Sequence, residues 1–147
     1  MAQPVAIRAA TVNDYSRCLP LFDSLYHGDL GPDFKRTFED YVAGGVVLVA
    51  ERSRKLVGVL VGSYRLDMDW EGRTATLDAL VVDETQRRGK VGTGLVERFV
   101  SLAQGQGCKA VKSRVNEKNT QAQRFHESLG FTRSPTYEYT VDLAEPR

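Results

Sequence analysis

The sequence predicts a single α/β domain in which helices pack on a mixed sheet. Its length of 147 residues suits one hydrophobic core. Apolar residues make up 41% and charged residues 27%, which is typical of a soluble globular chain. Segments with apolar residues at helical spacing also alternate with short β-branched runs. No internal repeat, low-complexity tract or linker interrupts the sequence, so residues 1–147 are expected to form one domain.

Patterns in the first half of the chain predict a strand, two helices and a hairpin. A β-type run at residues 5–9 precedes Thr11, a candidate N-cap, with Asp14 in the capping-box position. The first helix extends towards Gly28, and Pro20 predicts a kink or a break into two short pieces. A second helix is expected after Pro32 and ends at Gly44 and Gly45, with an apolar face formed by Phe34, Phe38, Tyr41 and Val42. Two strands, 46–51 and 56–64, joined by a polar turn, follow it.

The second half predicts three further strands and two helices. Residues 74–82 become almost continuously apolar towards their end, as in a strand covered on both faces. The elements expected after this strand are a helix ending near Gly105, a strand over 109–115, a helix over 119–128 and a last strand over 137–143. The resulting order, β-α-α-β-β-β-α-β-α-β, is that of a mixed sheet with helices packed on it.

Composition excludes several classes of function. Twenty basic residues against 19 acidic ones give a net charge of +1, which argues against a dedicated nucleic-acid binder. Cys18 and Cys108 are far apart in sequence and lack neighbours at ligand spacing, so neither a metal site nor a disulfide is predicted. No signal peptide and no apolar run of about 18 residues is present, so we expect a cytoplasmic protein without membrane contact.

The segment from Val82 to Leu95 carries the strongest functional signal. A buried strand leads into a glycine-rich basic loop, and the loop opens a helix whose first N–H groups and dipole attract anions. This pattern predicts a phosphate or pyrophosphate site, although a solvated basic turn is the alternative. The residues expected to contribute are Arg87, Arg88, Gly89, Lys90, Val91, Gly92, Thr93 and Gly94. The spacing matches neither a P-loop nor a dinucleotide fingerprint.

This loop resembles the acetyl-CoA-binding motif of the GNAT superfamily of N-acetyltransferases, Gln/Arg-x-x-Gly-x-Gly/Ala between a strand and a helix. Two registers are open. Residues 87–92 supply the first and last positions but place Lys90 at the inner glycine, whereas residues 86–91 place Val91 last. We prefer the first register, because residues 92–95 then match the start of the helix.

Residues 119–131 resemble the next motif of the superfamily, Asn-x-x-Ala-x-x-Phe/Leu-Tyr-x-x-x-Gly-Phe, with His126 in the tyrosine position. Together with the first and last strands, the resemblance covers essentially the whole chain. It implies a GNAT-like mixed, mostly antiparallel central sheet of about six to seven strands flanked by about four helices. It also implies acetyl-CoA as cofactor, an amine acceptor and, as in many such families, a homodimer.

The resemblance further implies roles for individual residues. Asp78, on the strand before the loop, is the candidate general base, with Glu84 a weaker candidate and a plain edge carboxylate the alternative. Thr76, Asp78 and Leu80 are expected to share one face of that strand. Backbone N–H groups near Leu80, Val81 and Val82 are expected to meet the pantetheine arm and the oxyanion.

His126 is expected to replace the tyrosine of the family as the acid that protonates the CoA thiolate, unless it only packs on its helix. Asn119 is expected to cap that helix and to touch the cofactor arm, and Phe125 is also assigned to cofactor binding. No cysteine stands in either motif, so the acetyl group is expected to pass directly to the amine in a ternary complex. A non-catalytic CoA-binding module of the same fold remains the alternative.

The acceptor pocket is expected between the first two helices and their connection. The residues assigned to it are Tyr26, His27, Asp29, Asp33 and Glu39. Their acidic and aromatic character suits a cationic amine, but the sequence does not name that amine.

Overall fold

The computed structural model describes residues 4–144, and for residues 87–89 it describes the backbone alone. The chain divides into two units, residues 1–114 and 115–147. Within the described residues, the first unit carries the sheet and the second carries one helix, α4 (Thr120–Ser128). The prediction of one domain over residues 1–147 remains a prediction.

The sheet of the first unit has five strands in sequential order. They are β1 (Ala6–Ala9), β2 (Val46–Arg52), β3 (Lys55–Asp67), β4 (Gly72–Val82) and β5 (Val111–Ser113). The first four run antiparallel to their neighbours, and β5 runs parallel to β4. The predicted mixed, mostly antiparallel sheet is therefore confirmed.

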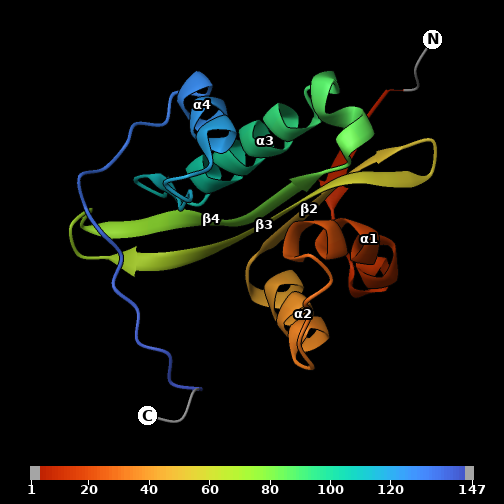
Figure 1. Ribbon diagram of the computed structural model, residues 1–147. Coiled ribbons are helices and arrows are strands. Elements are labelled where there is room, and N and C mark those ends of the chain that lie inside the picture. The colour runs from red at the N-terminus through yellow and green to blue at the C-terminus, as the bar shows by residue number, and fades with distance from the viewer. Residues whose placement is uncertain (1–3, 145–147) are drawn as a thin grey trace. The chain divides into compact units, whose positions relative to one another are not determined.

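Helices cover both faces of this sheet. The α-helices of the first unit are α1 (Tyr15–Tyr26), α2 (Phe34–Gly44) and α3 (Val91–Gly105), and two short 3₁₀ helices, η1 (Val12–Asp14) and η2 (Glu84–Gly89), precede α1 and α3. Figure 1 shows α1 and α2 on one face of the sheet and α3 on the other. With α4, the four predicted helices are all present.

Two expectations about individual elements are wrong. Residues 137–143 form no strand in the described part of the chain, and Tyr139, in their middle, is 93% exposed. Alternating apolar residues make a strand possible, but only a hydrogen-bonded neighbour makes one, and no described strand pairs with this segment. The sheet therefore has five strands rather than six or seven. Of the two outcomes expected at Pro20, the break into two short helices is also wrong, because α1 is continuous across this residue.

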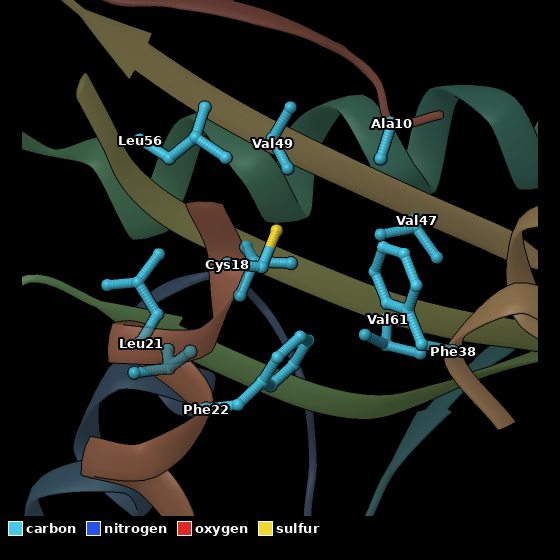
Figure 2. Close-up of a cluster of buried hydrophobic side chains, with 11 residues drawn as sticks. Ala10, Cys18, Leu21, Phe22, Phe38, Val47, Val49, Leu56 and Val61 are labelled. Atoms are coloured by element: carbon cyan, nitrogen blue, oxygen red, sulfur yellow. The ribbon is translucent and has the colours of Figure 1, made fainter. Parts of the chain in front are cut away.

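The face covered by α1 and α2 holds an apolar cluster. Figure 2 shows Cys18 and Phe22 of α1, with Phe38 of α2, directed at valines of β2 and β3. Cys18 is fully buried, and burial raises the pKa of its thiol to about 11. A thiol in this state is a packing group and a poor nucleophile at neutral pH.

The opposite face is built around Phe99 of α3, which is fully buried. A Cβ atom added to Gly62 of β3 would lie 2.5 Å from Cζ of Phe99. Gly62 thus gives the ring the space to lie directly on the sheet, so helix and strand approach more closely than any larger residue would allow.

A buried carboxylate ties the N-terminal segment to the edge of the sheet. Asp14 accepts two hydrogen bonds from the guanidinium of Arg8, at 2.8 and 2.9 Å, and one from the N–H of Thr11 at 2.8 Å. Arg8 in turn contacts Glu51 of β2 at 3.2 Å. The hydrogen bonds from Arg8 outweigh the effect of burial and lower the pKa of Asp14 to about 2.

Replacing Asp14 with Asn should lower the free energy of unfolding at pH 7 by about 2 kcal/mol, the equivalent of its pKa shift. Because the folded-state pKa lies below the ordinary value of 3.8, the contribution of Asp14 is complete above about pH 4. It is lost as the pH falls through about 2. Urea unfolding of the wild type and Asp14→Asn across this range measures the difference, with Asp69→Asn in an exposed turn as control. If the difference in unfolding free energy between the wild type and Asp14→Asn does not change with pH, the stabilisation does not come from the charge of Asp14.

Candidate functional site

The edge of β4 is open along its second half. The pairing of β4 with β5 joins only Ala75 to Val111, Thr76 to Lys112 and Leu77 to Ser113. From Asp78 to Val82, β4 continues along β3, and no strand of the described residues pairs with its other edge. Backbone N–H and C=O groups on such an edge can pair with an extended ligand that carries amide groups. The residues expected to meet the pantetheine arm, Leu80 to Val82, lie on this segment.

The loop after β4 leads directly into α3 and is ordered by Asp83. The carboxylate of Asp83 accepts hydrogen bonds from the N–H of Thr85 at 3.0 Å and from its hydroxyl at 2.9 Å. These bonds, with Lys55 at 3.2 Å, hold the pKa of Asp83 below its ordinary value. The backbone then follows η2 to Gly89, and the side chains of residues 87–89 lie outside the described residues. Glu84, the weaker base candidate, is exposed at the start of η2.

Lys90 occupies the position before the first turn of α3 in a left-handed backbone conformation, with φ of 61°. Its carbonyl accepts the hydrogen bond from the N–H of Gly94 at 3.0 Å, so the amides of Val91, Gly92 and Thr93 lie in the first turn. Glycine adopts this conformation most easily, and the motif places its inner glycine here in the first register. The backbone therefore favours that register.

Comparison of Lys90→Gly with Lys90→Ala should separate the effect of the backbone conformation at residue 90 from the effect of the Lys90 charge. Both variants lose the ammonium group, but only alanine keeps a Cβ in the left-handed region, which costs about 1–2 kcal/mol. Lys90→Gly should therefore be more stable than Lys90→Ala by about 1 kcal/mol in chemical denaturation, after the greater flexibility of glycine in the unfolded chain is allowed for. Equal stability of the two variants would argue against a left-handed Lys90. Calorimetry measures the affinity of both variants for acetyl-CoA. A loss of affinity shared by the two variants would result from the missing charge of Lys90.

Asp78 lies at a β-bulge in β4, and its carboxylate points towards α2. The pairing of β3 with β4 joins Val61 to Ala79 and Gly62 to Leu77, so Asp78 is the extra residue. Its Oδ2 accepts hydrogen bonds from the hydroxyl of Tyr41 at 2.7 Å and from the hydroxyl of Ser63 at 2.8 Å. The carboxylate thus lies half-buried where β5 leaves β4.

The bulge corrects the predicted face of β4. Thr76 pairs with Ser63, which bonds Asp78, so Thr76 and Asp78 lie towards the same side. Leu80 pairs with Leu60, so the side chains of the two residues point to the same face of the sheet. Gly58 lies two residues before Leu60, shares this face and lies against Leu95 of α3. Leu80 therefore faces α3 rather than α2, because the extra residue shifts the alternation by one.

Two tyrosines lie close enough to Asp78 for its charge to act on them. Burial, followed by the bond to Asp78, raises the pKa of Tyr41 to about 12. Burial and the charge of Asp78 also raise the pKa of Tyr26, whose side chain is 40% exposed. Both phenols are protonated at neutral pH. Of the residues assigned to the acceptor pocket, only Tyr26 is brought near Asp78; His27, Asp29 and Asp33 are exposed, and Glu39 is half-buried.

Sequence reasoning missed Tyr41 and Ser63 as members of the site. Tyr41 was expected only on the apolar face of the second helix. A signal was available, because a tyrosine on a buried face needs a partner for its hydroxyl. Ser63 carried no such signal.

In the second unit, Asn119 and His126 are fixed by contacts within α4 and its flanks. Asn119 accepts a hydrogen bond from the N–H of Ala122 at 3.0 Å, which confirms the predicted cap. Nδ1 of His126 lies 2.8 Å from the carbonyl oxygen of Ala122, and its ring meets Phe125 and Phe131 edge to face. A carbonyl oxygen only accepts, so Nδ1 carries a proton, and Nε2 carries one only when the ring is an imidazolium.

Within residues 4–144, no helix is both long and apolar enough to cross a membrane. Over the same residues, no three histidine, cysteine or acidic side chains are grouped to hold a metal ion. The open edge of β4 fits an extended amide-bearing arm, and the loop that turns at Lys90 into the start of α3 fits a pyrophosphate. The described residues therefore fit CoA.

Comparisons with known proteins agree with this geometry. The chain is 29% identical over 126 residues to the N-acetyltransferase CgeE of Bacillus subtilis (strain 168), itself uncharacterized. The match covers 84% of this chain, which spans about half (48%) of the length of that relative.

Two solved structures share the fold. The aminoglycoside N-acetyltransferase AAC(6')-Iy, solved with CoA, superposes with a TM-score of 0.87 at 18% identity over 97% of both chains. AAC(6')-Ih from Acinetobacter baumannii superposes with a TM-score of 0.83 at 20% identity over 95% of this chain and 98% of its own. The sequence model of the Acetyltransferase (GNAT) family matches residues 10–131, from the end of β1 through the motif that contains α4. Since this match spans most of the chain, the protein belongs to the Acetyltransferase (GNAT) family, whose members are acyltransferases that use acetyl-CoA.

Proposed function

We propose that this protein is an acetyl-CoA-dependent N-acetyltransferase that acetylates a cationic primary amine by direct transfer in a ternary complex. The observation that carries the proposal is the position of Asp78, a hydrogen-bonded carboxylate at the point where the edge of β4 opens. A base at this point lies beside the strand segment expected to hold the pantetheine arm. Membership of the family supplies the reaction class.

Each part of the chain has a role in this proposal. The backbone from Lys90 into α3, with the basic residues before it, binds the pyrophosphate, and the edge from Leu80 to Val82 holds the arm and offers N–H groups to the oxyanion. Bound acetyl-CoA supplies a thioester carbonyl. Asp78 removes a proton from the ammonium of the acceptor, which matters most for an amine with a pKa of about 10.4.

The acceptor class follows from the charges and rings around Asp78. A carboxylate flanked by Tyr26 and Tyr41 attracts a cation both by its charge and by the aromatic faces beside it. The buried thiol of Cys18 gives no reason to propose an acyl-cysteine intermediate. Direct transfer therefore needs the amine, the thioester, Asp78 as base and a proton donor for the leaving thiolate.

His126 is proposed as the acid that protonates the leaving thiolate, which requires the imidazolium form because Nδ1 is committed to the carbonyl of Ala122. His126→Ala should lower kcat by about 10²-fold or more, the usual size of a general-acid contribution. The affinity for acetyl-CoA should change little. Steady-state kinetics and calorimetry on the same samples measure both quantities, and wild-type turnover by His126→Ala would remove the role.

The proposal is tested first by the shift in melting temperature on adding acetyl-CoA, with NAD and ATP as controls. Acetyl-CoA at about 100 times its Kd should stabilise the fold by about 2.7 kcal/mol, or several degrees. A panel of primary amines, including polyamines, aminoglycosides and peptides with free termini, is then screened for CoA release. A shift with acetyl-CoA and turnover of a cationic amine is the expected result. Binding without acetylation of any amine would favour a non-catalytic CoA-binding module instead.

A further inference from the structure

Two hydroxyl groups from different elements converge on a single oxygen of Asp78. Tyr41 of α2 donates to Oδ2 at 2.7 Å, and Ser63 of β3 donates to the same atom at 2.8 Å. Hydrogen bonds to a carboxylate are shorter and stronger than those between neutral groups. Both of these hydrogen bonds fall on the same oxygen of the carboxylate, and this restrains its rotation.

The restrained carboxylate belongs to the extra residue of the bulge. Thr76 and Asp78 keep the ordinary alternation and share the face that carries Ser63, and the bulge shifts the alternation only from Ala79 onwards. The hydroxyl of Tyr41 remains protonated throughout the neutral range, since burial and the neighbouring carboxylate raise its pKa to about 12. Tyr41 thus acts as a constant donor, and Ser63 provides a second donor from the sheet itself.

We propose that Tyr41 and Ser63 are positioning residues that fix Oδ2 of Asp78, so that Oδ1 is the oxygen that takes the proton from the acceptor amine. This inference rests on the proposed function. In the reaction, one N–H bond of the ammonium breaks and its proton passes to Oδ1. The neutral nitrogen then forms the amide C–N bond as the C–S bond of the thioester breaks. His126, the proposed acid, gives a proton to the leaving thiolate and is reprotonated when the nitrogen loses its second proton, and Asp78 returns its proton to water.

Ionisable side chains from α1, from α2 and from the end of β5 interact with this carboxylate or with the tyrosine bonded to it. Tyr26 of α1 and Tyr41 of α2 sense its charge, and Arg114, which follows β5, is close enough to act on Tyr41. The tyrosines are neutral at neutral pH, and arginine is a permanent cation. A change in pH between about 5 and 9 therefore alters the charge of none of these side chains.

The experiment compares Tyr41→Phe and Ser63→Ala, each of which removes one hydroxyl and little volume. The amine is the best substrate of the panel. Measurements are kcat, KM for the amine and Kd for acetyl-CoA, with kcat/KM followed across pH. Ser63→Thr, which keeps a hydroxyl, is the rescue variant. Tyr64→Phe, the neighbouring residue on β3 whose ring lies beside Arg73, is the matched control.

Each single variant should lower kcat by about 10-fold or more, the usual effect of removing a hydrogen bond to a charged group, with acetyl-CoA affinity unchanged. The acidic limb of kcat/KM should move to higher pH, because a carboxylate that loses a donor holds its proton more tightly. Ser63→Thr should recover most of the loss, and Tyr64→Phe should match the wild type.

Wild-type kcat and an unmoved acidic limb in both variants would overturn the positioning roles and leave the proposed function standing. Failure of the wild type to acetylate any amine while it still binds acetyl-CoA would overturn the proposed function and the positioning roles together. A loss of acetyl-CoA affinity equal to the loss of kcat would show a general disturbance of the fold and would also contradict positioning.

Discussion

Asp78→Asn is expected to lower kcat for a lysine-like amine by about 10²–10⁴-fold, the range of a general-base contribution. Asparagine has nearly the shape of aspartate, and its carbonyl oxygen can still accept the hydroxyls of Tyr41 and Ser63. The variant therefore keeps the fold and the binding of acetyl-CoA, and loses only the group that takes the proton. Steady-state kinetics with the best amine, beside calorimetric titration of acetyl-CoA, separates these quantities.

The size of the effect should depend on the amine. An α-amino group, with a pKa of about 7.7, is partly neutral at pH 7 and needs little help from a base. An alkyl amine near about 10.4 needs much more. Asp78→Asn should therefore penalise alkyl amines far more than peptide termini. Asp69→Asn, in the exposed turn between β3 and β4, is the control. Near wild-type turnover of an alkyl amine by Asp78→Asn would remove Asp78 as the base.

Phe99→Ala is expected to lower the free energy of unfolding by about 3–5 kcal/mol, the usual loss for a buried phenylalanine. The ring is fully buried and lies directly on Gly62, where no other side chain can fill the space that it leaves. Against a total stability of about 5–15 kcal/mol, this loss would leave the domain barely folded at physiological temperature.

Urea unfolding at 25 °C measures this loss. The control is Leu102→Ala on the same helix, where the side chain is 37% exposed and the expected change is a fraction of that for Phe99. If Phe99→Ala loses no more unfolding free energy than Leu102→Ala, α3 does not pack on β3 as described. Acetyl-CoA should partly rescue the melting temperature of Phe99→Ala, because α3 begins at the proposed phosphate site.

Local patterns were sufficient for most of the fold. The observed bounds of four elements, β2, β3, β4 and α3, lie close to the predicted ones. The hydrophobic period and the turn residues that predict these elements lie within each segment, so no distant residue is needed to recognise them. The strand expected at residues 137–143 was not found, since a strand depends on a neighbour that is distant in sequence.

The site shows the same division between local and distant information. The motif located the loop and the departure at Lys90, and the left-handed backbone there gives that departure a physical meaning. The bulge at Asp78 has no glycine to mark it, so sequence alternation gave Leu80 the wrong face. The bonds from Tyr41 and Ser63 join residues 37 and 15 positions from Asp78, and no local pattern carries information of that kind.

The short pairing of β4 with β5 has a consequence for the behaviour of the apoprotein. Backbone groups left unpaired along an edge are a template for any extended chain, including another copy of the same protein. The five residues from Asp78 to Val82, proposed above to receive the cofactor, therefore also form an edge through which two copies of the protein could associate. Where acetyl-CoA is scarce, we expect the protein to be more prone to self-association, so the supply of the cofactor would set its solubility as well as its rate.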